Sequence, residues 1–171
     1  MARVPYVEVK DAINIRRALA NSPAAAKKNS DLAMYIRHES KLDARLRELA
    51  ILQVGYSARC AYEYAHHIEI GREFGVSDDE IRALADDTAG KPTPFDPLAK
   101  LVLKAAREMT DGTAISDATF AALKQQMSNE HLVDLVLAIA FYNATVRILD
   151  SLKVDVEPEY QHYLQEFPLP R

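Results

Sequence analysis

Hydrophobic residues recur at helical spacing along most of the chain, and no strand-like alternation exceeds about five residues. Two stretches are far more apolar than the rest. Residues 49–54 are interrupted only by Gln53, and residues 132–141 only by Asp134. Helices that are apolar around most of their circumference are buried. The sequence therefore predicts an all-α fold of about seven or eight helices, with these two segments at its centre.

Helix-start signals show where the individual helices of the chain begin. Ser22 is followed by Pro23, Asp43 precedes the first apolar stretch, and Ser77 with Glu80 has the spacing of a capping box. Helices are predicted over residues 11–20, 23–37, 44–54, 58–74, 78–85, 97–110, 117–127 and 129–152. An extended arm (1–10), a loop (86–95) and a tail (154–171) with one helical turn complete a single predicted domain, 1–171.

The predicted helix 58–74 carries the candidate chemistry. Ser57 is placed to cap it and Gly75 to end it, so Cys60 would lie in its first turn. The helix dipole there favours a thiolate. Cys60, Glu63 and His67 fall on one stripe of this helix, within roughly 60° of one another. His66 points about 100° away from His67, so the two histidines cannot share a role.

Glu48 lies at the edge of the first apolar stretch, twelve residues before Cys60. In one unbroken helix the two would stand about 18 Å apart. Residues 55–57, Gly-Tyr-Ser, look like a helix break, and a hairpin there would fold Glu48 back toward the Cys60, Glu63 and His67 stripe. Desolvation beside the apolar run would raise the pKa of Glu48 toward a value useful for catalysis.

Composition narrows the class of protein. A chain of 171 residues with 49% hydrophobic and 27% charged residues is normal for one globular domain. A net charge of −4 argues against a nucleic-acid surface. No apolar run approaches the roughly 20 residues of a membrane span, and no signal peptide is visible. A single cysteine excludes an intrachain disulfide, and we expect a cytoplasmic protein without a membrane partner.

These motifs resemble those of the carboxymuconolactone decarboxylase family, which includes the alkylhydroperoxidase D proteins. The redox-active branch has a Glu, eleven residues, and then Cys-x-x-Cys-x-x-x-His. Here Glu48, Cys60 and His67 match that spacing, and Glu63 stands in place of the second cysteine. The family's Tyr-Glu-Trp-x-x-His pattern corresponds to Tyr62, Glu63, Tyr64 and His67. The resemblance is strongest over residues 42–85.

The resemblance implies an alkylhydroperoxidase D-like helical fold and two possible reactions. One is a decarboxylase or lyase step on a small carboxylated lactone or acid, with Glu48 and His67 in proton transfer beside Cys60. The other is peroxide reduction by Cys60, which would borrow an external thiol because the second cysteine is absent. Glu63 and Tyr64 would act from behind the catalytic residues, with Glu63 orienting the imidazole of His67, or would orient the substrate. The family implies a homo-oligomer (dimer, trimer or hexamer) that needs no cofactor.

Each candidate also has a structural interpretation. Cys60 could be an inert buried thiol, His67 a satisfied interface histidine, and Glu48 a surface ion-pair partner of a nearby Arg or Lys. Glu63 could be purely structural. Glu48, Glu63 and His67 are acceptable metal ligands, but no second histidine lies on that face, so we expect no metal. A non-catalytic helical module and a helix-turn-helix protein are the alternatives from other classes.

Overall fold

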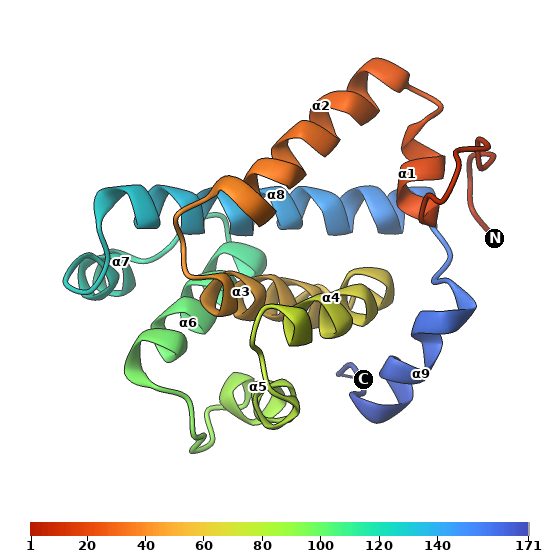
Figure 1. The fold of residues 1–171 in the computed structure, drawn as a ribbon. Coiled ribbons are helices and arrows are strands. Elements are labelled where there is room, and N and C mark those ends of the chain that lie inside the picture. The colour runs from red at the N-terminus through yellow and green to blue at the C-terminus, as the bar shows by residue number, and fades with distance from the viewer. Residues whose placement is uncertain (171) are drawn as a thin grey trace.

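The computed structural model describes residues 1–170, and every regular element in that range is helical (Figure 1). The all-α prediction is confirmed. The α-helices are α1 (Asn14–Leu19), α2 (Pro23–Met34), α3 (Ala44–Ser57), α4 (Ala61–Glu73), α5 (Asp78–Thr88), α6 (Pro97–Asp111), α7 (Asp117–Lys124), α8 (Asn129–Leu152) and α9 (Gln161–Glu166). A π-helix, η1 (Tyr35–Glu39), follows α2, and a short 3-10 helix, η2 (Pro158–Tyr160), precedes α9.

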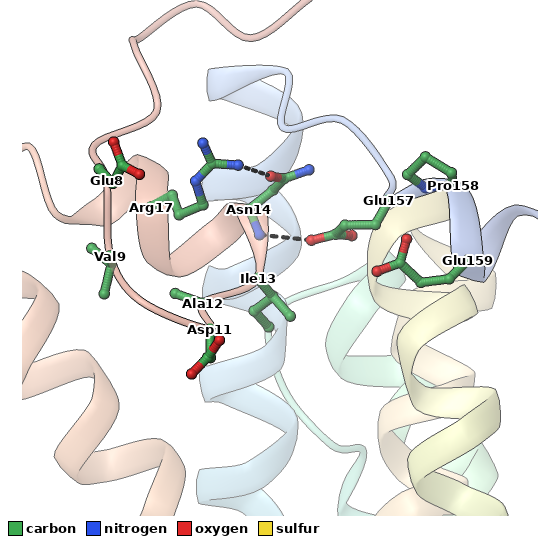
Figure 2. A pocket seen from close by; sticks show the side chains of 10 residues that line it. All are labelled: Glu8, Val9, Asp11, Ala12, Ile13, Asn14, Arg17, Glu157, Pro158 and Glu159. Atoms are coloured by element: carbon green, nitrogen blue, oxygen red, sulfur yellow. Dashed lines mark hydrogen bonds between the residues drawn. The ribbon is translucent and has the colours of Figure 1, made fainter.

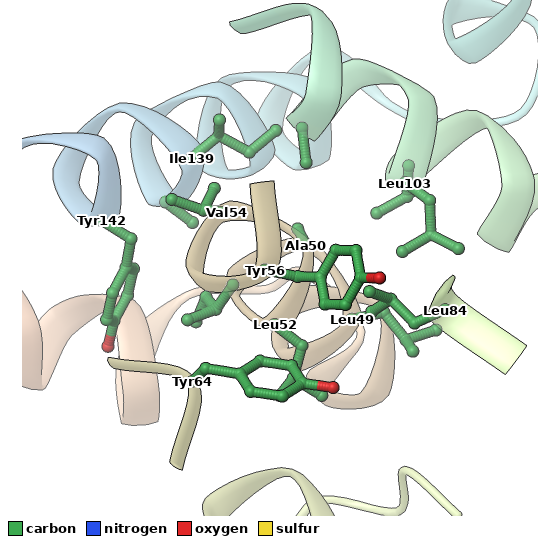
Figure 3. Packing of buried hydrophobic residues seen from close by; sticks show 14 of the residues in the cluster. Leu49, Ala50, Leu52, Val54, Tyr56, Tyr64, Leu84, Leu103, Ile139 and Tyr142 are labelled. Atoms are coloured by element: carbon green, nitrogen blue, oxygen red, sulfur yellow. The ribbon is translucent and has the colours of Figure 1, made fainter. Parts of the chain in front are cut away.

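Helix α3 is the centre of the core, as its apolar sequence predicts. Every residue from Leu46 to Tyr56 is buried, and the helix packs against α4, α6 and α8. Figure 3 shows side chains of α3 meeting Leu84 of α5, Leu103 of α6 and Ile139 of α8. Helix α2 differs, since it buries none of its residues and extends away from this core (Figure 1).

Helix α8 corrects one expectation from the sequence. Its length and mean hydropathy of 1.8 would suffice to cross a membrane, although no apolar run of that length was expected. Within the fold, 56% of its most apolar window is buried, as in the core helix of a globular protein. Asp134, the polar interruption of this helix, is also buried and holds η1 in place.

The break between α3 and α4 lies later than predicted. Helix α3 continues to Ser57, Arg59 takes the left-handed conformation (φ 56°), and Cys60 is the N-cap residue of α4. Gly55 lies inside α3 because the two helices meet there. A Cβ atom on Gly55 would stand 3.1 Å from the backbone nitrogen of Tyr64. Ser57 does not cap α4, since its Oγ accepts a hydrogen bond from Gln53.

Helix α1 begins at Asn14, three residues later than predicted, whereas the starts of α2, α3 and α5 to α8 agree with the sequence. The capping box of Ser77 and Glu80 forms as predicted, with both reciprocal hydrogen bonds. Asp43, Ser116 and Ser128 also accept backbone hydrogen bonds as caps of their helices. In the tail, η2 and α9 form more helix than the single turn predicted there.

Candidate active site

His67 lies between two carboxylates where α3 and α4 pack together. Its Nδ1 is 2.7 Å from Oε2 of Glu48, and its Nε2 is 2.9 Å from Oε1 of Glu63. Glu48 comes from α3, whereas Glu63 precedes His67 by one turn of α4. The exposed fractions of Glu48, Glu63 and His67 are 0%, 4% and 3%. The hairpin predicted from the sequence therefore does bring Glu48 to the stripe of α4.

Arg47 completes the buried cluster of charges. Its Nε donates to Oε1 of Glu48 at 2.9 Å, and its Nη2 lies 2.9 Å from the same oxygen without the alignment of a hydrogen bond. Its guanidinium also stacks over the ring of Phe74, 4.5 Å from the centroid. With His67 protonated, Arg47 and His67 balance Glu48 and Glu63, so the cluster is neutral as a whole.

The carboxylates set the protonation state of this cluster. Burial lowers the pKa of His67, but the charges of Glu63 and Glu48 outweigh burial and raise it to about 9. Burial raises the pKa of Glu48, but its contacts with His67 and Arg47 outweigh burial and lower it below the usual range, so the upward shift expected from the sequence is wrong. The imidazolium form therefore predominates at neutral pH, flanked by carboxylate groups.

A cavity of about 500 Å³ opens beside this cluster, between α1 and α2 on one side and α4 and α8 on the other. Glu63 and His67 line it, whereas Glu48 lies behind His67 on the core side. Tyr142 of α8 also lines the cavity, and its ring meets the imidazole of His67 edge to face at 4.9 Å between centroids. A ligand in the cavity would thus meet Glu63, His67 and Tyr142 directly.

Cys60 occupies a different environment from the one expected. It is 1% exposed, with the Asp150 carboxylate beside its thiol. Burial raises the pKa of Cys60 to about 12, and Asp150 contributes to that rise. The backbone amide of Glu63 favours the thiolate but does not offset burial. The prediction of a lowered pKa in the first turn of α4 is therefore wrong.

Tyr64 points into the core. It is buried against Tyr56, with ring centroids 5.8 Å apart (Figure 3). Burial raises its pKa above the usual range for a phenol. This position gives a packing role and does not support the substrate-orienting role expected for Tyr64.

His66 belongs to a second polar cluster, as its angular separation from His67 predicts. Its Nε2 is 2.7 Å from Oε2 of Glu157, and its ring stacks between Tyr62 and Tyr160, at 4.3 and 3.7 Å between centroids. Glu157 also accepts hydrogen bonds from the Tyr62 hydroxyl and from the backbone nitrogen of Asn14. This cluster joins the start of α1 and the tail to α4.

A second cavity, of about 600 Å³, shares Val9, Asp11 and Ile13 with the wall of the first, and Figure 2 shows the residues that line it. The N-terminal arm, the start of α1 and residues 157–159 line it, and Arg17 and Asn14 hydrogen-bond to each other in its wall. Four of its ten lining residues are acidic and one is basic, and none belongs to the His67 cluster. Among residues 1–170, no group of His, Cys, Asp and Glu side chains is arranged to hold a metal ion.

Two residues of the cavity wall, Arg37 and Tyr142, were not anticipated from sequence patterns. Arg37 comes from η1, and its side chain lies near Tyr142 of α8 in the cavity wall. Asp134 was visible only as the polar interruption of an apolar helix. Its carboxylate accepts hydrogen bonds from the Tyr35 hydroxyl, the Ser40 hydroxyl and the Lys41 amide, at 2.9, 2.7 and 3.1 Å.

Comparison with known proteins agrees with this geometry. The sequence matches the carboxymuconolactone decarboxylase family over residues 23–108, half of the chain. The chain belongs to this family. The matched range includes Glu48, Cys60, Glu63 and His67, so the family assignment covers the whole candidate site on α3 and α4.

Solved structures share the fold over nearly the whole chain. An uncharacterized peroxidase-related protein of Ralstonia eutropha JMP134, described as an alkylhydroperoxidase AhpD core, has a TM-score of 0.74 at 17% identity, covering 99% of this chain and 98% of its own. ATU0492 of Agrobacterium tumefaciens, described as a putative antioxidant defence protein AhpD, has a TM-score of 0.75 at 21% identity, covering 92% and 99%.

The same fold occurs in the debrominase Bmp8, solved as a cysteine-to-alanine variant in complex with 2,3,4-tribromopyrrole. Its TM-score is 0.77 at 15% identity, covering 89% of this chain and 81% of that one. No curated protein matches the sequence. At these identities the structural neighbours establish the AhpD-like fold alone, because a shared fold does not imply a shared reaction.

Proposed function

We propose that this member of the carboxymuconolactone decarboxylase family is an acid–base enzyme that decarboxylates, or otherwise acts as a lyase on, a small carboxylated acid or lactone. One observation carries the proposal: His67 is held between Glu48 and Glu63 and, together with Glu63, faces a cavity of about 500 Å³. That volume is in the usual range for a small-molecule site. Cys60 lies outside the lining of this cavity.

Each member of the cluster has its own part in this reaction. Glu48 positions the imidazole from the core side and favours its charged form. When the bond to the leaving carboxylate breaks, its electron pair stays on the substrate carbon and carbon dioxide departs. The proton that this carbon then takes comes from the His67–Glu63 pair, at Nε2 or at the Glu63 carboxyl. Until that transfer, the imidazolium charge stabilises the developing enolate or carbanion, and once the proton has been given up the imidazole is neutral.

The proposed enzyme works in the cytoplasm as a homo-oligomer, without a cofactor and without nucleic acid or membrane as partner. Helix α2 supports an oligomer because it buries no residue within one chain. An amphipathic helix without intrachain burial gains little stability by itself. A second copy packed on α2 would supply that burial beside the cavity.

Proton exchange tests the proposal without knowledge of the natural substrate. Small carboxylated lactones and acids are incubated in D₂O, and exchange at the carbon next to the carboxylate, together with carbon dioxide release, is followed by NMR. We expect Glu63→Gln and His67→Asn to lower the rate by about 10²- to 10⁴-fold. Cys60→Ala is the control and retains activity. Full activity in Glu63→Gln, or loss in Cys60→Ala, would contradict the proposal.

A second candidate is one-cysteine peroxide reduction, which the peroxidase and antioxidant names of two structural neighbours favour. The Cys60 thiolate would attack the O–O bond, giving a sulfenic acid and an alcohol. One external thiol would then form a mixed disulfide with loss of water, and a second would attack that mixed disulfide, freeing the Cys60 thiol and forming an external disulfide. Rapid alkylation of Cys60 at pH 7, lost in Glu48→Gln and His67→Asn, would support this candidate over acid–base chemistry.

A further inference from the structure

Arg37 is a cation in the cavity wall without a carboxylate partner among residues 1–170. Its guanidinium lines the cavity that His67 and Glu63 also line. Several other arginines of the chain pair with carboxylates, namely Arg45, Arg47, Arg72, Arg82 and Arg107. A half-buried guanidinium that faces a cavity, with no carboxylate occupying its donors, is suited to a ligand that carries its own negative charge.

The backbone of Arg37 is held in an unusual and well-anchored conformation. It lies in the π-helix η1, closed by a hydrogen bond from the Ser40 nitrogen to the Tyr35 oxygen at 2.9 Å. The Asp134 carboxylate holds both ends of η1, through Tyr35 on one side and Ser40 on the other. Such π-turns concentrate at functional sites. The anchoring reduces the entropy lost when Arg37 binds a ligand.

Tyr142 links Arg37 to the acid–base cluster. Its side chain lies near that of Arg37 in the cavity wall, and its ring packs edge-on against His67. Burial raises the pKa of Tyr142 well above the usual range, so the hydroxyl keeps its proton and can donate. A guanidinium beside a phenol hydroxyl offers adjacent donors for the two oxygens of a carboxylate.

We infer that Arg37 and Tyr142 form the binding subsite for the carboxylate of a singly charged acid whose apolar body lies along the cavity toward His67. The inference rests on the proposed function in one respect only, namely which end of the bound acid reacts. Arg37 adds one positive charge to a buried cluster that is otherwise neutral, so one bound carboxylate restores neutrality.

The rest of the cavity selects against more highly charged or sugar-like ligands. Its walls are largely aliphatic and aromatic, and they include Ile15, Leu19, Ala33, Ile70 and Phe141. Its exposed rim holds more acidic than basic side chains: Asp11, Glu69 and Glu73 against Arg16. Solvent screens this rim, but its sign opposes entry of a polyanion. A small monocarboxylate with an apolar body fits the aliphatic and aromatic walls, and its single charge is repelled less by the acidic rim than that of a polyanion.

Benzoate and benzamide are suitable probes, because they share shape and differ in charge. Binding to the full chain is measured by isothermal titration calorimetry and by shifts of the amide resonances near the cavity. We expect benzoate to bind at least about tenfold more tightly than benzamide, since a charge-assisted hydrogen bond replaces a neutral one. Equal binding of the two, or no binding of benzoate, would overturn the inference.

Three variants separate this subsite from the rest of the site. Arg37→Gln should weaken benzoate binding by about 10- to 100-fold and leave benzamide unchanged, and Arg37→Lys should restore part of the loss. Arg16→Gln removes the same charge from the rim and should change binding by less than about threefold. Benzoate affinity in Arg37→Gln equal to wild type, with circular dichroism showing an intact fold, would also overturn the inference.

His67→Asn distinguishes failure of the inference from failure of the proposed function. We expect this variant to bind benzoate with near wild-type affinity while losing proton exchange, because the carboxylate subsite lies at Arg37. Benzoate binding without any acid–base activity in wild type would reject the proposed function and keep the subsite. Activity that survives Arg37→Gln with unchanged KM would reject the subsite and keep the function.

Discussion

His66 and His67 are neighbours in the sequence and belong to two unlike polar clusters. Each has a ring nitrogen 2.7 Å from a carboxylate, Glu157 for His66 and Glu48 for His67. Both histidines line the small-molecule cavity, but only His67 has a second carboxylate partner, Glu63. His66 instead stacks between two tyrosines and has one acidic partner.

The difference shows that a buried His–Glu contact does not by itself indicate catalysis. Around His67 the charges of Glu63 and Glu48 set the protonation state of the imidazole. Around His66 the carboxylate of Glu157 also accepts hydrogen bonds from Tyr62 and Asn14, so its contacts all serve to join segments of chain. We interpret the first cluster as chemical and the second as structural.

The sharpest test of this contrast is Glu48→Ala. It removes the anion that faces both Arg47 and His67, and leaves two buried cations with only Glu63 nearby. We expect the free energy of unfolding at pH 7, measured by urea denaturation, to fall by about 3–5 kcal/mol. The matched Glu157→Ala variant should lose less of its free energy of unfolding. A loss in Glu48→Ala below that of Glu157→Ala would reverse our ranking of the two clusters.

A second test uses pH. The pKa of His67 is about 9 in the folded protein, against an ordinary value of 6.5. Its protonation therefore stabilises the fold fully below pH 6.5, and this stabilisation disappears as pH rises through about 9. We expect the free energy of unfolding to fall by up to about 1.4 kcal/mol per pH unit in this window.

Matched variants of the two histidines show which imidazole causes this pH dependence. Urea midpoints measured between about pH 6 and 9.5 should lose this slope in His67→Gln and keep it in His66→Gln. An unchanged slope in His67→Gln would show that the imidazole is neutral in the folded protein.

The third test acts on the structural cluster. Glu157→Gln keeps the size of the side chain and removes the charge that receives hydrogen bonds from Asn14 and Tyr62. We expect a loss of about 1–3 kcal/mol. Hydrogen exchange at the Asn14 amide should accelerate, while amides of α3 near Glu48 should not change. Faster exchange at both places would mean that the two clusters unfold together.

Cys60 should give the smallest effect. Cys60→Ala removes one buried sulfur that lies outside the cavity lining, so we expect a stability loss of about 1 kcal/mol and unchanged ligand binding. In wild type, iodoacetamide should alkylate Cys60 far more slowly than a free thiol at about pH 8, since burial raises its pKa to about 12. Fast alkylation in the folded state would contradict this description.

The fold followed largely from local signals. The apolar runs of α3 and α8 identified the core, and the caps at Asp43, Ser77 and Ser128 fixed helix starts. The error at the turn between α3 and α4 has a clear origin. Gly55 was interpreted as a helix breaker, but it is needed because the backbone of Tyr64 packs against it, a contact between helices that a single sequence does not display.

The site was only partly predictable for the same reason. Helical spacing and the resemblance to the family placed Glu48, Glu63 and His67 together. The structure confirms that these three side chains are in contact. Burial at the start of α4 could not be inferred, so the pKa of Cys60 was predicted with the wrong sign. Arg37 depends on a π-turn held by Asp134 of α8, a helix far along the chain, and no local pattern reveals such a contact.

The hydrogen bonds of Glu157 have a consequence for how the chain folds. The bond between Glu48 and His67 spans 19 residues, whereas Glu157 reaches His66 across 91 residues and Asn14 across 143. Closing longer loops costs more entropy and is generally slower. The α3–α4 hairpin is therefore expected to assemble early and the Glu157 cluster late. Since Tyr62, His66 and Tyr160 of that cluster also line the cavity, ligand-binding competence should be among the last properties acquired during refolding.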